Sequence, residues 1–177
     1  MVRQTNSPES QRLVGESSRK LSWARMNLDE AWNFYESGNR EFIFEFIKRG
    51  NFDANHLIGG GKSLLIEAVA RGDLELVQEV LEIPGVDVNF MGNSGFLPIQ
   101  LSFPFPEVFD ALLLADVNLL ARNAFGSNPI EQALKEGRLD LAERMLRRAE
   151  RQNEDEGKEI ERLVLEFWEK EEKQDFK

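Results

Sequence analysis

The chain contains no cysteine and only one histidine, His56, among its 177 residues. Without cysteine there is no disulfide, no thiolate zinc site and no cysteine nucleophile, and a single histidine cannot build a multi-histidine metal site. No apolar run approaches the roughly 18 residues that a membrane span needs, and the N-terminal residues lack the apolar core of a signal peptide. These absences argue against two large classes of enzyme chemistry and predict a protein without a membrane span.

Positive charge is also in short supply. The chain has 22 Lys and Arg residues against 32 Asp and Glu residues, which gives a formal net charge of -10 at pH 7. Such an excess of negative charge repels phosphate backbones, so nucleic acid is not expected as a partner. Apolar residues make up 41% of the chain, which is enough to bury a core in a chain about one domain long.

Two stretches of the chain repeat one another. KSLLIEAVARGDLELVQEVL, residues 62–81, aligns with SNPIEQALKEGRLDLAERML, residues 127–146. In both stretches a glycine separates two apolar helical segments, and a third glycine, Gly38, follows a similar segment. Gly38, Gly72 and Gly137 are 34 and 65 positions apart, close to one and two periods of about 33 residues. The pattern predicts units of two helices joined by a glycine turn.

These residues resemble the ankyrin-repeat family, whose unit pairs a T-P-L-H-x-A-A-x-x-G inner helix with an outer helix and a hairpin loop. The second unit matches this pattern at residues 63–66 and Gly72, and the fourth unit matches it at residues 128–131 and Gly137. The third unit is eroded, because FPFP at residues 103–106 replaces the glycine turn and shortens the unit by about two residues.

The resemblance implies an all-α ankyrin-repeat solenoid of helix-turn-helix units joined by hairpin loops, with Ala68 and Ala133 where adjacent inner helices approach closely. A C-terminal amphipathic helix either caps the last repeat or docks into a partner's groove, and Gly157 is expected to separate it from the preceding outer helix. The expected boundaries are 1–22 for a flexible N-terminal tail, 23–153 for the ankyrin-repeat domain with repeats at 23–57, 58–91, 92–122 and 123–153, and 154–177 for the charged C-terminal helix.

The run GGGKS at residues 59–63 is similar to a phosphate-binding loop. A Walker motif, however, needs a glycine where this chain has His56, and it follows a buried strand, which NFDAN at residues 51–55 does not predict. In the repeat register the same glycines lie at a hairpin tip, where glycine tolerates positive φ. A nucleotide-binding enzyme that uses GGGKS is therefore only a third interpretation. No catalytic constellation is visible, so we predict no enzymatic activity and no cofactor.

The preferred interpretation is a non-enzymatic protein–protein interaction module that binds another protein through its hairpin tips and concave inner-helix face. Function on such a scaffold resides at exposed positions that the repeat pattern leaves free. Phe96 and Phe125 at loop positions either anchor a partner or fold back onto the neighbouring hairpin or outer helix. The candidate protein-binding residues are Lys62, Arg71, Met91, Ser94, Phe96, Phe105, Phe125, Ser127, Lys135 and Glu136.

A second interpretation is a regulatory or scaffold subunit that contacts its partner mainly through the C-terminal helix. The glutamate-rich end of the chain, EKEEKQDFK, is also similar to C-terminal stretches of effectors that intracellular bacteria inject into host cells. A cytoplasmic location is therefore expected, either in the cell that makes the protein or in a host cell. The sequence leaves the oligomeric state open, with a monomer favoured.

Asn89 is a candidate modification site. In a eukaryotic cytosol, ankyrin repeats are substrates of an asparaginyl hydroxylase that favours a leucine eight positions and an acidic residue two positions before the target asparagine. Leu81 and Asp87 stand at those places before Asn89, whereas Asn55 has Ile47 in the leucine position and is a weaker match. The alternative is that Asn89 only stabilises its hairpin through side-chain to backbone hydrogen bonds.

Overall fold

The computed structural model describes residues 25–50 and 52–174, so the tail expected at residues 1–22 lies outside the described part. The chain divides after Gly50 into two compact units. Apart from one hairpin of two short strands, the regular elements are helices, and the predicted all-α class is confirmed. No helix within the described ranges is long and apolar enough to cross a membrane.

The first unit is a helix pair, α2 (Leu28–Glu36) and α3 (Glu41–Arg49). Helix α2 begins at a capping box, in which the Asn27 side chain accepts a hydrogen bond from Glu30 N and the Glu30 carboxylate accepts one from Asn27 N. Helix α3 ends at Gly50, whose φ of 66° only glycine adopts without strain. The two helices pack against one another and bury Leu28, Ala31, Trp32, Ile43, Phe46 and Ile47.

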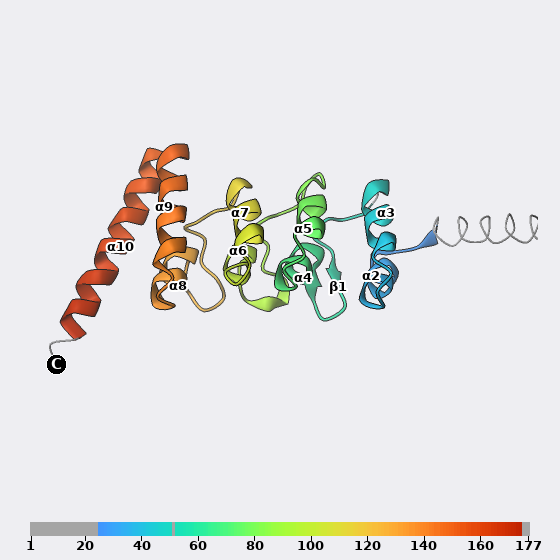
Figure 1. Ribbon diagram of the computed structural model, residues 1–177, viewed down its shortest axis with the longest axis horizontal. Helices are drawn as coiled ribbons and strands as arrows, with labels where there is room; N and C mark the ends of the chain where they lie inside the picture. The colour runs from blue at the N-terminus through green and yellow to red at the C-terminus, as the bar shows by residue number, and fades with distance from the viewer. Residues whose placement is uncertain (1–24, 51, 175–177) are drawn as a thin grey trace, which may run out of the picture. The chain divides into compact units, whose positions relative to one another are not determined.

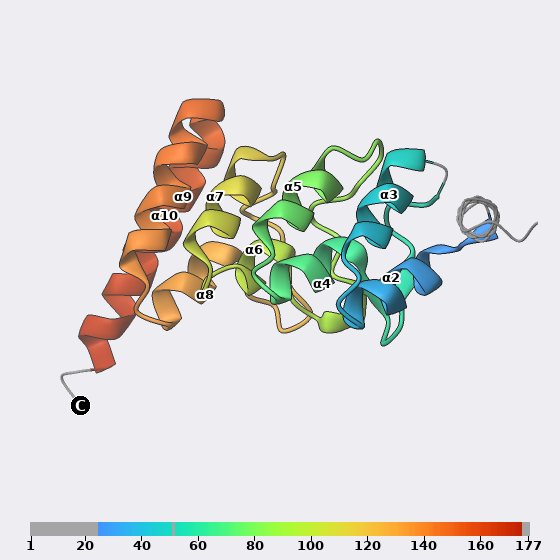
Figure 2. The same ribbon diagram turned by 45° about the vertical axis from the view of Figure 1, so that its right-hand side comes forward.

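The second unit contains three successive helix pairs and a final long helix (Figures 1 and 2). A short antiparallel hairpin precedes the first pair, with Leu57 opposite Ser63 and Ile58 opposite Lys62. The elements in chain order are β1 (Leu57–Ile58), β2 (Lys62–Ser63), α4 (Leu64–Ala70), α5 (Leu74–Leu81), η1 (Gly92–Ser94), α6 (Pro98–Leu101), α7 (Pro106–Leu114), α8 (Pro129–Lys135), α9 (Leu139–Gln152) and α10 (Glu154–Gln174).

Two of the inner helices begin at a side-chain cap. Ser63 Oγ accepts a hydrogen bond from Ile66 N at 3.3 Å at the start of α4, and Asn128 Oδ1 accepts one from Glu131 N at 2.8 Å at the start of α8. Ser63 and Asn128 stand where the repeat pattern has its threonine. Each one satisfies a backbone N–H that the first turn of a helix leaves unpaired, which explains why a short polar residue begins both helices.

The helix pair of the third repeat, α6 and α7, is shorter than its neighbours. Its inner helix α6 has only four residues, and Pro106 begins α7 after the FPFP segment. The side chain of Asn55 accepts a hydrogen bond from a backbone N–H group 32 positions further along the chain, and that of Asn89 accepts one from a group 29 positions further. The spacing between equivalent positions is therefore three residues shorter across the third repeat. Phe105 packs over the turn of the preceding pair, because a Cβ atom placed on Gly72 would lie 2.5 Å from Phe105 Cδ1. The aromatic segment thus fills space that the preceding glycine leaves open.

The core of the second unit is continuous from one helix pair to the next. Helix α4 packs against α6 and α6 packs against α8, while the outer helix α5 packs against α7. Many side chains on these helices are covered completely by the neighbouring helix pairs, as a stack of repeats requires. The residues with no exposed surface include Ile66, Ala68, Val69, Leu76, Val77, Val80, Ile99, Phe109, Leu112, Ile130 and Ala133.

Helix α10 covers the last helix pair, packing against both α8 and α9 (Figure 1, red). Ile160 is fully buried there, and Gly157 lies so close to α9 that a Cβ atom would be 3.0 Å from Glu150 Cα. The expectation that Gly157 separates the two helices was wrong. The break lies at Asn153, which leaves helical geometry and accepts hydrogen bonds from Asp155 N and the following N–H, at 3.0 Å and 3.4 Å.

Candidate functional site

The loops that precede the inner helices are joined in a row. Gly61 O accepts a hydrogen bond from Asn93 N at 2.8 Å, and Gly95 O accepts one from Ala124 N at 2.9 Å. Both glycines have φ near 75°, which allows the chain to turn back at these points. The loop tips of the second, third and fourth repeats therefore form one line of surface, here called the loop row, comprising residues 57–62, 91–96 and 122–127.

The GGGKS run forms the tip of the β1–β2 hairpin, as the repeat register predicted. Gly60 and Gly61 turn the chain with φ of 85° and 76°, and Gly61 N donates to Ile58 O at 2.9 Å. The N–H of Gly61 is thus engaged within the turn. Lys62 Nζ lies 2.9 Å from Glu67 Oε1, so the lysine contacts a carboxylate of its own repeat.

Lys62 and Arg71, two of the predicted site residues, meet at a carboxylate that the sequence did not single out. Glu67 is only 8% exposed and lies between them, with Arg71 Nε 3.4 Å from Glu67 Oε2. The side chains of Lys62 and Arg71 remain about two-fifths exposed. The two cations are thus partly exposed and share one nearly buried carboxylate.

Phe96 and Phe125 contact one another in the loop row, with their ring planes tilted by 42°. Their ring centroids are 4.9 Å apart, and a Cβ atom on Gly95 would lie 3.3 Å from Phe125 Cε2. Phe125 thus folds back across the preceding loop and leaves Phe96 partly covered. The Phe125 side chain nevertheless remains 69% exposed. The rings fold back as the second alternative expected, the anchoring of a partner stays a prediction, and Phe125 is the most exposed aromatic side chain of the loop row.

Met91 and Ser94 shape the third loop. Ser94 Oγ donates to Met91 O at 2.6 Å and accepts a hydrogen bond from Phe96 N at 3.2 Å. Both residues are half-buried. Ser94 therefore fixes the short η1 turn that presents Phe96, and its hydroxyl is already engaged within the loop.

Ser127 is buried rather than exposed, contrary to its selection as an exposed position. It is 7% exposed, its N–H donates to Asn123 Oδ1 at 3.0 Å, and its hydroxyl accepts a hydrogen bond from Lys135 Nζ at 2.9 Å. The side chain of Asn123 accepts hydrogen bonds from the backbone of the fourth loop, and these bonds hold Ser127 in its buried position. Lys135 and Glu136, at the end of α8, are exposed as expected.

Phe105 also differs from its predicted role. It was selected as an exposed position, but the ring is half-buried against Gly72 of the preceding repeat, so it contributes to packing between repeats. The reason is the shortened third unit, in which the FPFP segment occupies the place of the missing glycine turn.

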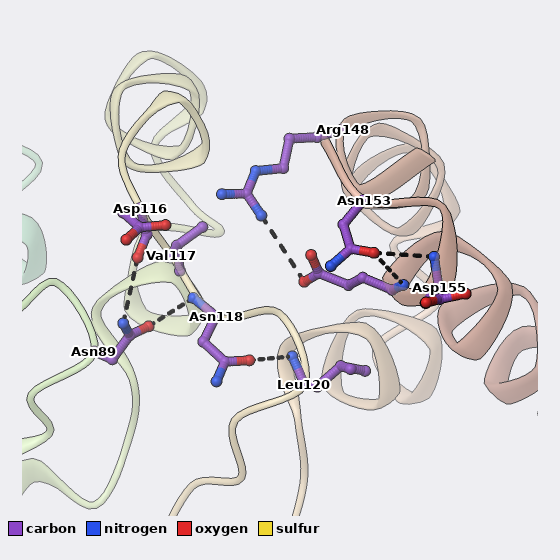
Figure 3. A pocket seen from close by; sticks show the side chains of 9 residues that line it. Asn89, Asp116, Val117, Asn118, Leu120, Arg148, Asn153 and Asp155 are labelled. Atoms are coloured by element: carbon purple, nitrogen blue, oxygen red, sulfur yellow. Dashed lines mark hydrogen bonds and ion pairs between the residues drawn. The ribbon is translucent and has the colours of Figure 1, made fainter. Parts of the chain in front are cut away.

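Asn89 bridges two repeats (Figure 3). Its Oδ1 accepts a hydrogen bond from Asn118 N at 2.8 Å, and its Nδ2 donates to Asp116 O at 3.4 Å. Asn55 makes the same pair of bonds one repeat earlier, to Asp87 N at 2.8 Å and Gly85 O at 3.0 Å. Each asparagine therefore joins its loop to the backbone of the next repeat, which is the structural role considered for Asn89.

The series of bridges ends at Leu120, which stands where the next asparagine would be. A hollow of about 700 Å³ lies beside it, lined by Asn89, Asn118, Arg148 and the start of α10 (Figure 3). Arg148 crosses this hollow, with Nη2 donating to Ala115 O at 3.1 Å and Nη1 3.9 Å from Glu156 Oε1. The contact between the third repeat and the start of α10 is thus made by the Arg148 guanidinium, where the earlier repeats use an asparagine amide.

Hydroxylation of Asn89 stays a prediction. Because the Asn89 amide is hydrogen-bonded through both its oxygen and its nitrogen, the modifying enzyme must first open this bridge locally. Asn55 is bridged in the same way but has Ile47 in the leucine position, so Asn89 should react to a greater extent than Asn55. Incubation with the asparaginyl hydroxylase followed by peptide mass spectrometry measures both sites in one sample. An Asn89 peptide without added oxygen would contradict the prediction.

One group of side chains was missed at the sequence level. Arg144, Arg147, Arg148 and Arg151 follow helical spacing on one face of α9, and Leu114 at the end of α7 is 85% exposed. The spacing i, i+3, i+4, i+7 is visible in the sequence and would have identified the basic face. The exposure of Leu114 could not be seen, because it depends on where α7 ends.

Comparison with known proteins supports the fold. No family model matches the chain. The chain is 41% identical over 85 residues to cyclin-dependent kinase 4 inhibitor B from Bos taurus, an ankyrin-repeat protein. The match covers 46% of this chain and 63% of that relative, which is less than two thirds of the relative's length. The molecule has an all-α ankyrin-repeat fold, and the relative is by its name an inhibitor of a cyclin-dependent kinase.

Proposed function

We propose that the chain is a non-enzymatic protein–protein interaction module that binds its partner through the loop row and the adjoining concave face of the inner helices. The observation that carries this proposal is the Phe96–Phe125 pair, in which Phe125 keeps 69% of its surface exposed. An aromatic pair in mutual contact holds its rings in place, so little conformational entropy is lost when a partner covers them.

Charged side chains lie on the repeats of this aromatic pair and on the repeat before them. Lys62, Arg71, Lys135 and Glu136 carry exposed charges at the loop row and at the ends of the inner helices. A central apolar anchor with a charged rim is the usual composition of a transient interface, where the anchor supplies affinity and the rim supplies specificity. The similarity to an ankyrin-repeat inhibitor gives independent support.

A protein kinase is the first partner to test, because the relative is named as an inhibitor of cyclin-dependent kinase 4. Binding of the purified chain to that kinase can be measured by biolayer interferometry. Phe125→Ser is expected to weaken binding at least tenfold, whereas Trp168→Ser, which changes an aromatic side chain that is 43% exposed on α10, should leave it unchanged. If the kinase does not bind, the same two variants can be compared in quantitative capture from a cell extract.

The C-terminal helix is the alternative contact surface. Its outer side carries Leu165 and Trp168, which are 58% and 43% exposed, and a cluster in which Arg162 pairs with Glu159 and Glu166. The hydrogen bond from Arg162 lowers the pKa of Glu159, and the same bond raises the pKa of Arg162. Loss of the partner in Trp168→Ser but not in Phe125→Ser would favour this alternative, in which the chain is a regulatory or scaffold subunit.

A nucleotide-binding role for GGGKS predicts that ATP raises the melting temperature, since a ligand of the folded state must stabilise it. We expect no such shift. Lys62→Ala should change the free energy of unfolding by less than about 1 kcal/mol, because Lys62 is partly exposed and Glu67 keeps Arg71 as a partner. A melting temperature that rises with ATP and no longer does so in Lys62→Ala would revive the enzyme interpretation.

The cytoplasm is the proposed site of action, either in the producing cell or, for a secreted effector, in a host cell. The acidic, glutamate-rich end of the chain supports the second case, as does a module that needs only a partner protein to act. A fusion to a reporter enzyme that is active only in host cytosol would test it, with the fusion lacking residues 169–177 as the control.

A further inference from the structure

Four arginines and an exposed leucine line a groove between the outer helices α7 and α9, away from the loop row. The groove measures about 590 Å³, and we call it the arginine groove. Its lining residues are Asp110, Leu113 and Leu114 from α7 and Arg144, Arg147, Arg148 and Arg151 from α9. These groups give the lining a formal charge of +3 on a molecule whose net charge is -10.

Two of the arginines form the fixed end of the groove. Arg144 pairs with Asp110, and its guanidinium lies 4.9 Å from the centroid of the Phe109 ring, which is itself buried. Arg148 donates to Ala115 O at 3.1 Å, its side chain is 11% exposed, and its Nε is buried without a hydrogen-bond partner among the described residues. A buried guanidinium donor left unpaired carries a desolvation cost.

The other two arginines are open to solvent. Arg147 is 60% exposed at its side chain and, within the described residues, pairs along its own helix with Glu143, four residues earlier. Arg151 lies one turn further on α9 and is exposed. An incoming carboxylate can replace water around both guanidinium groups in the paired geometry that arginine offers.

Leu114 supplies an apolar contact beside these cations. It is 85% exposed, more than Phe125 at 69%, and the adjacent Leu113 is 9% exposed. A leucine left in water at the end of a helix contributes nothing to the fold. Covering it with an apolar side chain is favourable by about 25 cal/mol for each Å² removed from water.

We infer that the arginine groove binds an acidic segment of a partner protein, with carboxylates on Arg147 and Arg151 and an apolar side chain on Leu114. Charge complementarity selects this occupant, because the groove is a local reversal of the charge of the whole molecule. The apolar contact at its centre distinguishes it from a nucleic-acid site, which the net charge of -10 further disfavours. The inference rests on the proposed function and adds a second contact surface to it.

The test uses a fluorescein-labelled peptide, EDELLEDE, and fluorescence anisotropy with the full chain. Binding should weaken as salt rises, because the contacts are exposed charges. Arg147→Glu with Arg151→Glu should weaken binding at least tenfold, and Leu114→Ser should weaken it several-fold. Lys48→Glu with Lys158→Glu is the matched control, since it makes the same change of net charge at exposed lysines elsewhere and should shift the affinity by less than twofold. Circular dichroism checks that each variant is folded.

Several results would overturn the inference. Equal losses in the groove variant and the lysine control would show that only net charge matters, and equal binding of QNQLLQNQ would show that carboxylates are not read. Tighter binding of an oligonucleotide of eight bases would reassign the groove to nucleic acid. A concentration-dependent dimer that Arg147→Glu with Arg151→Glu abolishes would assign it to a second copy of the chain. Phe125→Ser should leave peptide binding intact, so failure here is distinguishable from failure of the proposed function.

Discussion

Replacing Gly72 with alanine is expected to lower the free energy of unfolding by about 2–4 kcal/mol. Two costs combine at this position. Gly72 has a φ of 66°, where a residue with a Cβ atom is strained by about 1–2 kcal/mol, and the new Cβ would lie within 2.9 Å of three ring atoms of Phe105. Urea denaturation followed by circular dichroism measures the change.

Gly137 provides the matched control. It occupies the same turn in the fourth repeat with a φ of 68°, but nothing lies within 4 Å of a Cβ atom placed there. Gly137→Ala should therefore show only the backbone cost, about 1–2 kcal/mol. A double-mutant cycle of Gly72→Ala with Phe105→Ala should reveal favourable coupling, because the smaller side chain removes the clash. Equal effects at the two glycines would show that Phe105 does not press on the turn.

Ala68→Leu and Ala133→Leu are each expected to cost about 1–3 kcal/mol through overpacking. Both alanines have no exposed surface, and both lie on inner helices that pack against α6. A leucine needs room that a packed interior does not have, so neighbouring helices must separate. The same urea denaturation applies.

Ala70→Leu is the control for this pair of substitutions. Ala70 lies at the end of α4 and is exposed, so the larger side chain should be tolerated within about 0.5 kcal/mol. If Ala68→Leu and Ala133→Leu were as neutral as Ala70→Leu, the inner helices would not be in close contact at these positions and the repeat register would be wrong.

The repeat register could be predicted because it depends on local chemistry. Ser63 and Asn128 are good helix caps, and glycines at the loop and turn positions take up positive φ, so each mark in the sequence has a backbone reason. The eroded third unit was also recognised from the FPFP segment. What that segment does could not be predicted, since the contact of Phe105 with Gly72 joins two different repeats.

The candidate site was harder to predict for the same reason. Exposure was assigned by repeat position, which failed for Ser127 because Asn123 gathers the fourth loop around its own amide. Repeat position also does not determine whether Phe96 and Phe125 contact one another, since the contact between their rings depends on the spacing between two loops. Gly157 was taken as a helix breaker, although its small size serves the close approach of α10 to α9.

Helix α10 determines whether the stack of repeats can grow. In a repeat array the last unit presents the same unsatisfied face as every other unit, so a second molecule can add head to tail and begin a fibre. Here α10 already covers α8 and α9, the helices of the fourth repeat, so this face is occupied. Polymerisation through this face would first require α10 to be displaced, together with the burial of Ile160.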